Sequence, residues 1–493
     1  MNTPTVALTL LALGFLLGLF NVPSVLIERK GRPTAALAWM LALLLLPYLG
    51  PLLWWSIGRL HLRRRRRRRH RAKAAMISRL TDVRRDLGPN PVSGKHALFS
   101  RATARDQARA LVFAESERVF RSRASNHVRL LVDATAAYDA MERAIRAAEH
   151  HVHFQFYIYQ VDATGRRFRD LLAERARAGI RVRVLVDGVG GASAAGEFFD
   201  PLRAAGAFVS TFLPLRFLRR RLSINFRNHR KILVVDGRVA FTGGLNIGDE
   251  YMGAWHDLAL QLEGPVVDQL QEVFAEDWYF AEGFSIATRR YFGRFDEVGK
   301  LPMGSDPRET LEARCRIIAS GPDAATNLMF QVFFLACTTA TERIYIVTPY
   351  FIPDQAMMVA LCSAAERGVD VRLMLPRTAD VPFASLASRS YYDGLIASGV
   401  RVFEYEPGIL HAKALIFDRD WAVCGSANVD IRSFRLNFEA GCFMEGEAVN
   451  ARLTALFEAN LERCREVDRA ALANRSWGAV LKEAAAHLFS PLL

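Results

Sequence analysis

The chain has 493 residues, of which 24% are charged and 51% hydrophobic, so it is longer than one ordinary domain. This composition excludes a disordered chain and favours a globular protein with some membrane character. Lysine and arginine outnumber aspartate and glutamate by 65 to 51, and the net charge of +14 favours an anionic partner, either nucleic acid or an acidic membrane surface.

Two apolar runs open the chain. Residues 1–27 and residues 33–58 carry no charged side chain. Each run is long enough to cross a hydrocarbon core of about 30 Å as a helix. We expect a transmembrane hairpin with helices over about 5–27 and 35–57, the second kinked near Pro47. A cleaved signal peptide is the alternative for the first run, but no basic segment or A-x-A cleavage site accompanies it.

A basic block, RLHLRRRRRRRHRAK, follows the second run at residues 59–73, whereas only ERKGRP separates the two runs. By the positive-inside rule this block faces the cytoplasm, which predicts a multi-pass protein whose remaining chain is cytoplasmic. Arginines 63–69 either anchor this topology or gather anionic lipid headgroups as well. Nucleic acid is not the expected partner, because no aromatic residues interleave the block to stack on bases.

Beyond a basic linker at residues 59–110, short apolar strand patterns alternate with helical patterns, as in an α/β fold. The plan occurs twice, which predicts one domain over 111–305 and a second over 306–493. The first half carries an extra basic and apolar stretch, LPLRFLRRRLSINF, at residues 213–226. We interpret it as a loop near the site or the membrane.

The two halves share a motif at matching offsets. Counted from a histidine, a lysine follows at +2, an aspartate at +7, a glycine at +14, an asparagine at +17 and a carboxylate at +28. Two such matches exclude chance and indicate a duplication in which two halves build one site. The residues are His229, Lys231, Asp236, Gly243, Asn246 and Asp257 in the first half, and His411, Lys413, Asp418, Gly425, Asn428 and Glu439 in the second.

Residues i and i+2 of a strand point to the same face, so each half presents its histidine and lysine together. Two lysines can neutralise the oxygens of a phosphoryl group, one histidine can attack phosphorus, and the other can protonate the leaving oxygen. A turn after each strand brings TGGLN or CGSAN back beside the histidine. The candidate phosphate-binding residues there are Asn246, Asn428, Ser426 and Gly244.

Four carboxylates complete the motifs. Asp257 and Glu439 are suited to hold an imidazole N–H, and the spacing leaves open whether each serves its own half or the opposite one. Asp236 and Asp418 follow their strands at an odd offset. We group them with the catalytic residues as members of the motif, but expect them to point away from the phosphate and to have a supporting role, with a basic residue as a candidate partner.

No metal or other cofactor is expected, because the lysines supply the positive charge. His150, His151 and His153 are interpreted as the start of a strand rather than as a metal site. The six cysteines lie between Cys315 and Cys464 without a C-x-x-C pair, which favours reduced thiols over a disulfide framework or a zinc site.

These motifs resemble the phospholipase D superfamily, whose members carry two His-x-Lys-x4-Asp motifs. The segments YIYQVDATG, TPYFIPD and GSANVDIRSFRLNFE, together with the paired N-terminal runs, are similar to bacterial cardiolipin synthases. The resemblance implies two α/β domains sharing one active site and a phosphohistidine intermediate. It further implies an inner-membrane enzyme that binds phosphatidylglycerol and other anionic phospholipids, with His229 as nucleophile and His411 as acid and then base.

Two other functions remain open. A phosphodiesterase of the same superfamily would hydrolyse phospholipid or nucleic acid, although the membrane runs argue against a nuclease. A non-catalytic adaptor would bind anionic lipid through its arginines, but intact motifs in both halves argue against it. The C-terminal stretch WGAVLKEAAAHLF, residues 477–489, is expected to pack on the second domain, with an interfacial membrane helix as the alternative.

Overall fold

A computed structural model of the chain forms two compact units, of which the first contains the described residues 3–30, 33–58 and 214, and the second contains the other described residues. The predictions for the linker at 59–110, the arginines at 63–69 and nearly all of the insertion at 213–226 lie outside the described residues. The residues that the structure describes are 3–30, 33–58, 123–194, 196–214, 226–293, 309–324 and 327–490.

The N-terminal unit begins with α1 (Thr3–Glu28), a continuous helix that tolerates Pro23 in its interior. Its segment Leu8–Glu28 is the one helix in the described part of the chain that is long and apolar enough to cross a membrane. The first run therefore has the length and composition that the sequence predicts for a span.

The second apolar run is interrupted at Pro47, where the sequence predicts a kink in the helix over 35–57. Pro47 has no backbone N–H to donate, and Tyr48 adopts a positive φ of 66°, which together interrupt the helical hydrogen bonds. The run is divided into α2 (Pro33–Leu45), α3 (Leu49–Leu53) and a π-helical turn (Trp54–Gly58).

The second unit is built on one 16-stranded sheet, which β1 (Arg123–Val132) and β10 (Leu311–Ser320) join at its middle as an antiparallel pair. Outward from β1 the first half contributes β9 (Leu258–Glu263), β7 (Val239–Gly243), β6 (Ile232–Val235), β2 (His151–Phe156), β3 (Arg181–Asp187) and β4 (Phe208–Phe212). Outward from β10 the second half contributes β19 (Asn437–Glu445), β17 (Trp421–Gly425), β16 (Ala414–Phe417), β11 (Arg343–Val347), β13 (Asp370–Pro376), β14 (Arg401–Tyr405) and β20 (Cys464–Glu466).

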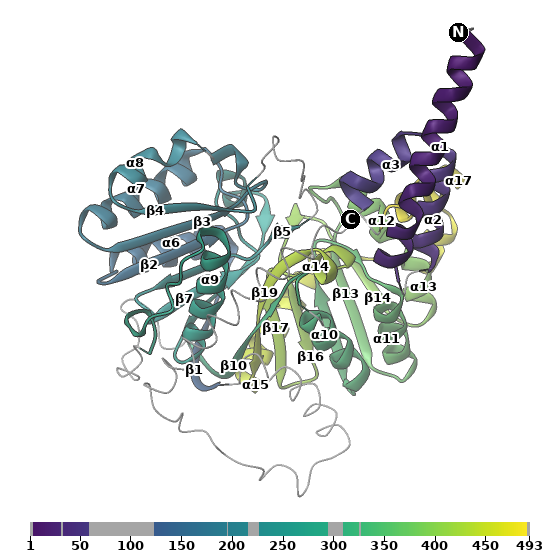
Figure 1. Ribbon diagram of the computed structural model, residues 1–493. Helices are drawn as coiled ribbons and strands as arrows, with labels where there is room; N and C mark the ends of the chain where they lie inside the picture. The colour runs from purple at the N-terminus through teal and green to yellow at the C-terminus, as the bar shows by residue number, and fades with distance from the viewer. Residues whose placement is uncertain are drawn as a thin grey trace, which may run out of the picture. The chain divides into compact units, whose positions relative to one another are not determined.

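The halves repeat each other strand by strand. In each half the first four pairings outward from β1 or β10 are antiparallel and the next two are parallel. The two halves lie side by side in the sheet (Figure 1). The duplication that the sequence predicts is therefore present in the topology, and the join between the halves is a continuous ladder.

Helices cover the sheet in both halves (Figure 1). The crossover helix of each half begins at an aspartate, since Asp162 accepts a hydrogen bond from the Gly165 N–H and Asp354 accepts one from the Met357 N–H. The helices are α6 (Asp133–Arg146), α7 (Ala163–Arg177), α8 (Asp200–Ala204), α9 (Val266–Glu282), α10 (Leu328–Thr339), α11 (Gln355–Glu366), α12 (Pro382–Arg389), α13 (Tyr392–Ala397), α14 (Ile431–Arg435), α15 (Glu447–Leu461), α16 (Arg469–Ala473) and α17 (Trp477–His487).

The join between the halves is packed with apolar side chains. One core cluster contains Leu260 and Trp278 of the first half together with Ile317 and Cys442 of the second. His153, at the start of β2, is also a packed residue, and its ring stacks on Phe274 with centroids 4.6 Å apart. The join is therefore closely packed below the site, which fixes the two motifs relative to each other.

Candidate active site

His229 is placed by a strand that belongs to the other half's ladder. It follows β5 (Arg227–Asn228), which pairs in parallel with the first two residues of β19. The His229 N–H donates to the Phe438 carbonyl at 2.9 Å. The next residue, Glu439, lies with Oε2 3.1 Å from His229 Nδ1, and the Ser426 carbonyl oxygen lies equally close to that nitrogen. A second-half carboxylate therefore orients the first-half histidine.

The reverse arrangement holds for His411. It follows β15 (Ile409–Leu410), which pairs in parallel with β8 (Trp255–His256) of the first half. The His411 N–H donates to the His256 carbonyl at 2.8 Å. Asp257 then follows, and its Oδ2 lies 2.6 Å from His411 Nδ1. Each carboxylate therefore orients the histidine of the opposite half, a choice that the motif spacing leaves open.

These contacts fix which nitrogen of each ring is available. The side chains of Asp257 and Glu439 are fully buried, and those of His229 and His411 are only 13% and 7% exposed. A carboxylate can only accept, so each ring carries its proton on Nδ1. Nε2 of each histidine is then the nitrogen that remains for a reacting atom.

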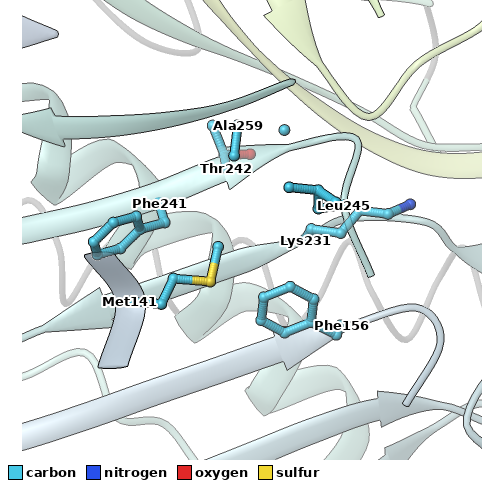
Figure 2. A pocket seen from close by; sticks show the side chains of 8 residues that line it. Met141, Phe156, Lys231, Phe241, Thr242, Leu245 and Ala259 are labelled. Carbon is cyan, nitrogen blue, oxygen red and sulfur yellow. The ribbon is translucent and has the colours of Figure 1, made fainter. Parts of the chain in front are cut away.

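The two lysines lie behind the histidines. Lys231 Nζ donates to the His229 carbonyl at 2.8 Å, and Lys413 Nζ donates to the His411 carbonyl. The stem of Lys231 lies near Phe156 and Leu245, and its nitrogen points away from the apolar side chains around Met141 (Figure 2).

Burial changes the pKa of each lysine. It lowers the pKa of Lys231 to about 7, against the opposing attraction of Glu439, and that of Lys413 to about 8, against that of Asp257. Each lysine also lowers the pKa of the histidine in the other half. The four motif side chains therefore lie within electrostatic reach of one another.

Both histidines are neutral near pH 7. Burial lowers the pKa of His229 to about 4, although Glu439 acts in the opposite direction. Burial also lowers the pKa of His411, with a further contribution from Lys413. A neutral imidazole has a lone pair on Nε2, as a nucleophile requires.

Gly244 and Ser426 hold equivalent positions, and both contact the buried carboxylates. A Cβ on Gly244 would lie 2.1 Å from Asp257 Oδ1, so the space expected for a substrate atom is filled by this carboxylate. Ser426 Oγ donates to Glu439 Oε2 and accepts from the Ala440 N–H at 3.0 Å. Gly244 thus makes room for the carboxylate that orients His411, and the Ser426 hydroxyl contacts the carboxylate that orients His229.

Asn246 and Asn428 are buried and engaged within their own halves. Asn246 Nδ2 donates to the Tyr251 hydroxyl at 3.1 Å, and its Oδ1 accepts from the Ile158 N–H. Asn428 Nδ2 donates to Asp430 Oδ2 at 3.0 Å. Each amide nitrogen has a second hydrogen, so these contacts leave one donor on each residue.

Asp236 and Asp418 lie at the opposite ends of β6 and β16 from the histidines. Asp236 accepts backbone N–H groups of residues 149–151 at 2.7–2.8 Å. Asp418 accepts those of residues 341–343 at 2.8–3.3 Å. Their grouping with the catalytic residues is corrected, because they fix the start of β2 and β11. The expectation that they point away from the phosphate agrees with this geometry.

The sequence did not single out two aromatic rings beside the histidines. The Tyr157 ring lies edge-on to His229 with centroids 4.8 Å apart, and the Trp255 ring lies edge-on to His411 at 4.9 Å. Lys231 Nζ lies 5.4 Å from the centroid of Tyr157. Trp255 could have been found from the sequence, because it lies only two residues before Asp257 of the motif.

A buried ion pair supports the crossing strands. Arg230 Nη1 lies 2.8 Å from both carboxylate oxygens of Asp277 on α9. Its Nε donates to the Glu439 carbonyl at 3.1 Å and its Nη2 to the Ser320 carbonyl at 3.0 Å. Arg230 thus fixes the backbone of the residue that orients His229. Its counterpart is Ala412, so sequence symmetry gave no signal for it.

Comparison with known proteins agrees with this geometry. Residues 141–278 and 336–461 match a family model described as "Cardiolipin synthase, PLD-like domain". Residues 7–59 match a model described as a phospholipase D-nuclease N-terminal region. The first match contains both histidine motifs, so the family similarity falls on the site described above.

Several curated proteins are similar over most of the chain. A cardiolipin synthase of Alkalihalophilus pseudofirmus is 32% identical over 98% of this chain and 94% of its own length. A cardiolipin synthase A of Pseudomonas aeruginosa is 37% identical over 87% and 85%, respectively. Among solved structures, a phosphatidylserine synthase of Haemophilus influenzae matches with a TM-score of 0.58 and 15% identity, over 79% of this chain and 100% of that one. This last likeness concerns the fold.

Proposed function

The chain belongs to the PLD-like cardiolipin synthase family, and we propose that it transfers a phosphatidyl group from one phosphatidylglycerol to another, giving cardiolipin and glycerol. The observation that carries this proposal is the pair of histidines, each with Nδ1 on a carboxylate of the opposite half. Two imidazoles so held, with two lysines beside them, suit a displacement at phosphorus.

In the first step, Nε2 of His229 attacks the phosphorus of the donor lipid. The nitrogen–phosphorus bond forms as the bond between phosphorus and the oxygen of the headgroup glycerol breaks. His411 donates its proton to that leaving oxygen. We assign the nucleophile to His229, as the family resemblance implies, and burial keeps its ring unprotonated for the attack. The bound phosphodiester anion raises the pKa of His411, which lets this ring carry the proton.

In the second step, the terminal hydroxyl of another phosphatidylglycerol attacks the phosphohistidine. His411 takes the hydroxyl proton, the new phosphorus–oxygen bond forms, and His229 leaves as a neutral ring. The lysines neutralise the phosphoryl oxygens in both steps. The second amide hydrogens of Asn246 and Asn428 supply neutral donors to the same oxygens.

Family membership and the apolar helix α1 indicate a membrane-associated protein. We further propose a multi-pass protein of the bacterial inner membrane, with both catalytic halves in the cytoplasm. The basic block at 59–73 supports this orientation. The proposed parts are a membrane hairpin over 1–58, a linker over 59–110, and halves over 111–305 and 306–493.

The test uses purified full-length protein with labelled phosphatidylglycerol as the sole lipid substrate. Cardiolipin and free glycerol are expected from the wild type and not from His229→Ala. His127→Ala, which changes a half-buried histidine of β1, is the matched control and should retain activity. Phosphatidic acid without cardiolipin would contradict the proposal and identify a hydrolase. Cardiolipin formed by His229→Ala would contradict the assigned nucleophile.

A further inference from the structure

α17 (Trp477–His487) packs on the second half through one face. Ala486 is buried together with Ala384 and Ala387 of α12 and with Ile352. His487 Nδ1 lies 3.0 Å from Ser390 Oγ at the end of α12. The expectation that the C-terminal stretch packs on the second domain is confirmed, and this inner face has its partner.

The opposite face of α17 is apolar and uncovered. Trp477, Leu481 and Leu488 recur at helical spacing and are 79%, 51% and 77% exposed. The acidic side chain of Glu483, by contrast, is buried and paired with Arg389 at 3.4 Å. This pattern is the reverse of a helix on the surface of a soluble protein, which turns its apolar residues inward.

The exposed apolar surface continues onto α12. Val381 and Phe383, at the start of that helix, are about as exposed as Val480 on α17. The rings of Phe383 and Phe489 meet edge-on with centroids 5.6 Å apart. We call this surface the outer patch. Its main residues are Val381, Phe383, Trp477, Leu481, Leu488 and Phe489.

The residue directly before the outer patch, Asp380, lies within electrostatic reach of the second motif, since its charge opposes the lowering of the Lys413 pKa by burial. Asp380, directly before Val381, accepts a hydrogen bond from the Tyr350 hydroxyl at 2.6 Å. Tyr350 precedes β12 (Phe351–Ile352), which pairs in parallel with β18 (Val429–Asp430). β18 directly follows Asn428 of the second motif. A short path of paired residues therefore links the outer patch to the motif that carries His411.

We propose that the outer patch inserts into the interfacial layer of the bilayer and holds the rim of the active site at the membrane surface. The proposal rests on the proposed function, because a phospholipid at the histidines must keep its acyl chains in apolar surroundings. Tryptophan, phenylalanine and leucine are the residues of interfacial helices, and the exposed Lys482 next to the stripe suits anionic headgroups.

A direct test follows the fluorescence of Trp477 in the full-length protein. Wild type and Trp477→Phe are reconstituted in phosphatidylglycerol vesicles with and without dibrominated phosphatidylcholine. The emission of Trp477 is obtained by subtracting the emission spectrum of Trp477→Phe from that of the wild type, since the other six tryptophans are common to both. Bromine in the lipid should quench most of this difference, whereas iodide in the buffer should not.

Two results of the quenching test would overturn the proposal. Quenching by iodide alone would place the outer patch in water. Protection from both quenchers would place it against protein, either a second copy or another part of the chain. Neither result depends on turnover, so the test remains decisive for an inactive protein.

A second test separates docking from chemistry. Leu481→Asp should lower turnover of phosphatidylglycerol in vesicles by at least about tenfold and leave turnover of monomeric short-chain phosphatidylglycerol unchanged. Val359→Asp, at an exposed apolar position on α11, is the matched control and should change neither. Equal losses on both substrates, or no loss on either, would overturn the proposal. If the wild type turned over neither vesicular nor short-chain phosphatidylglycerol, the proposed function would be refuted. The quenching test would then decide by itself whether the outer patch enters the bilayer.

Discussion

His229 and Glu439 are separated by 210 residues in the sequence and by 3.1 Å in the structure. Asp257 and His411 repeat this relationship across 154 residues. Both pairs arise because a two-residue strand of one half joins the backbone of the other just before the functional side chain. Orientation of each histidine is thus a property of the pairing between the halves.

We expect Glu439→Gln to lower kcat by about 10²–10⁴-fold, as when the carboxylate of a catalytic triad becomes an amide. The amide has nearly the same shape but no charge to stabilise the imidazolium or to fix its tautomer. The measurement is steady-state cardiolipin formation. Glu447→Gln, at the start of α15, is the control. Near wild-type kcat in Glu439→Gln would show that His229 does not depend on this carboxylate.

The lysine pKa values predict how lipid affinity depends on pH. Lys231 and Lys413 titrate near 7 and 8 in the empty site, and both are cationic below those values. A phosphodiester anion favours the cationic forms, so affinity is highest at low pH and falls as pH rises through about 7–8. The KM for phosphatidylglycerol should therefore rise from about pH 7 to about pH 9.

Lys413→Arg provides the control for this pH dependence. Arginine stays charged throughout the range, so the upper part of the rise in KM should disappear in this variant. Isothermal titration in buffers of different ionisation enthalpy should also show proton uptake on lipid binding near pH 8. A KM that is constant over the range would contradict the assignment of the lysines to phosphate neutralisation.

Removing one partner of the buried Arg230–Asp277 pair should be costly. Arg230→Met leaves the Asp277 carboxylate buried with its principal charge partner gone, which should lower the free energy of unfolding by about 3–5 kcal/mol. Adding Asp277→Leu should restore part of the stability without restoring kcat, because the Glu439 carbonyl still lacks the hydrogen bond from Arg230 Nε. Denaturation curves and kcat, measured on both variants, separate the two effects. Full recovery of kcat would show that Arg230 acts on stability alone.

Asp236→Asn and Asp418→Asn should reduce stability by about 1–3 kcal/mol each, because each aspartate accepts several backbone N–H groups. The kcat of the folded fraction should remain within about threefold of wild type. Thermal melts and activity at a temperature well below the melting point provide the comparison. A loss of kcat as large as that of Glu439→Gln would return these residues to the catalytic set.

The sequence predicted what depends on local pattern. Strand alternation, the duplicated offsets from His229 and His411, and the lysines at +2 indicate the fold and the site because side-chain direction in a strand follows from spacing. The crossing of the carboxylates was not predictable, since it depends on β5 and β15, which have two residues each and no pattern of their own. The contact between Gly244 and Asp257 was likewise not predictable, because it depends on tertiary packing.

The crossed carboxylates also determine when the protein can first act during its synthesis. Translation starts at the N-terminus, so α1 and His229 exist long before Glu439 has been added to the chain. Until the ribosome has added Glu439, His229 has no carboxylate to orient it. His411 itself is added only 28 residues before Glu439. A nascent chain can thus reach the lipid bilayer through α1 before it has a complete catalytic centre.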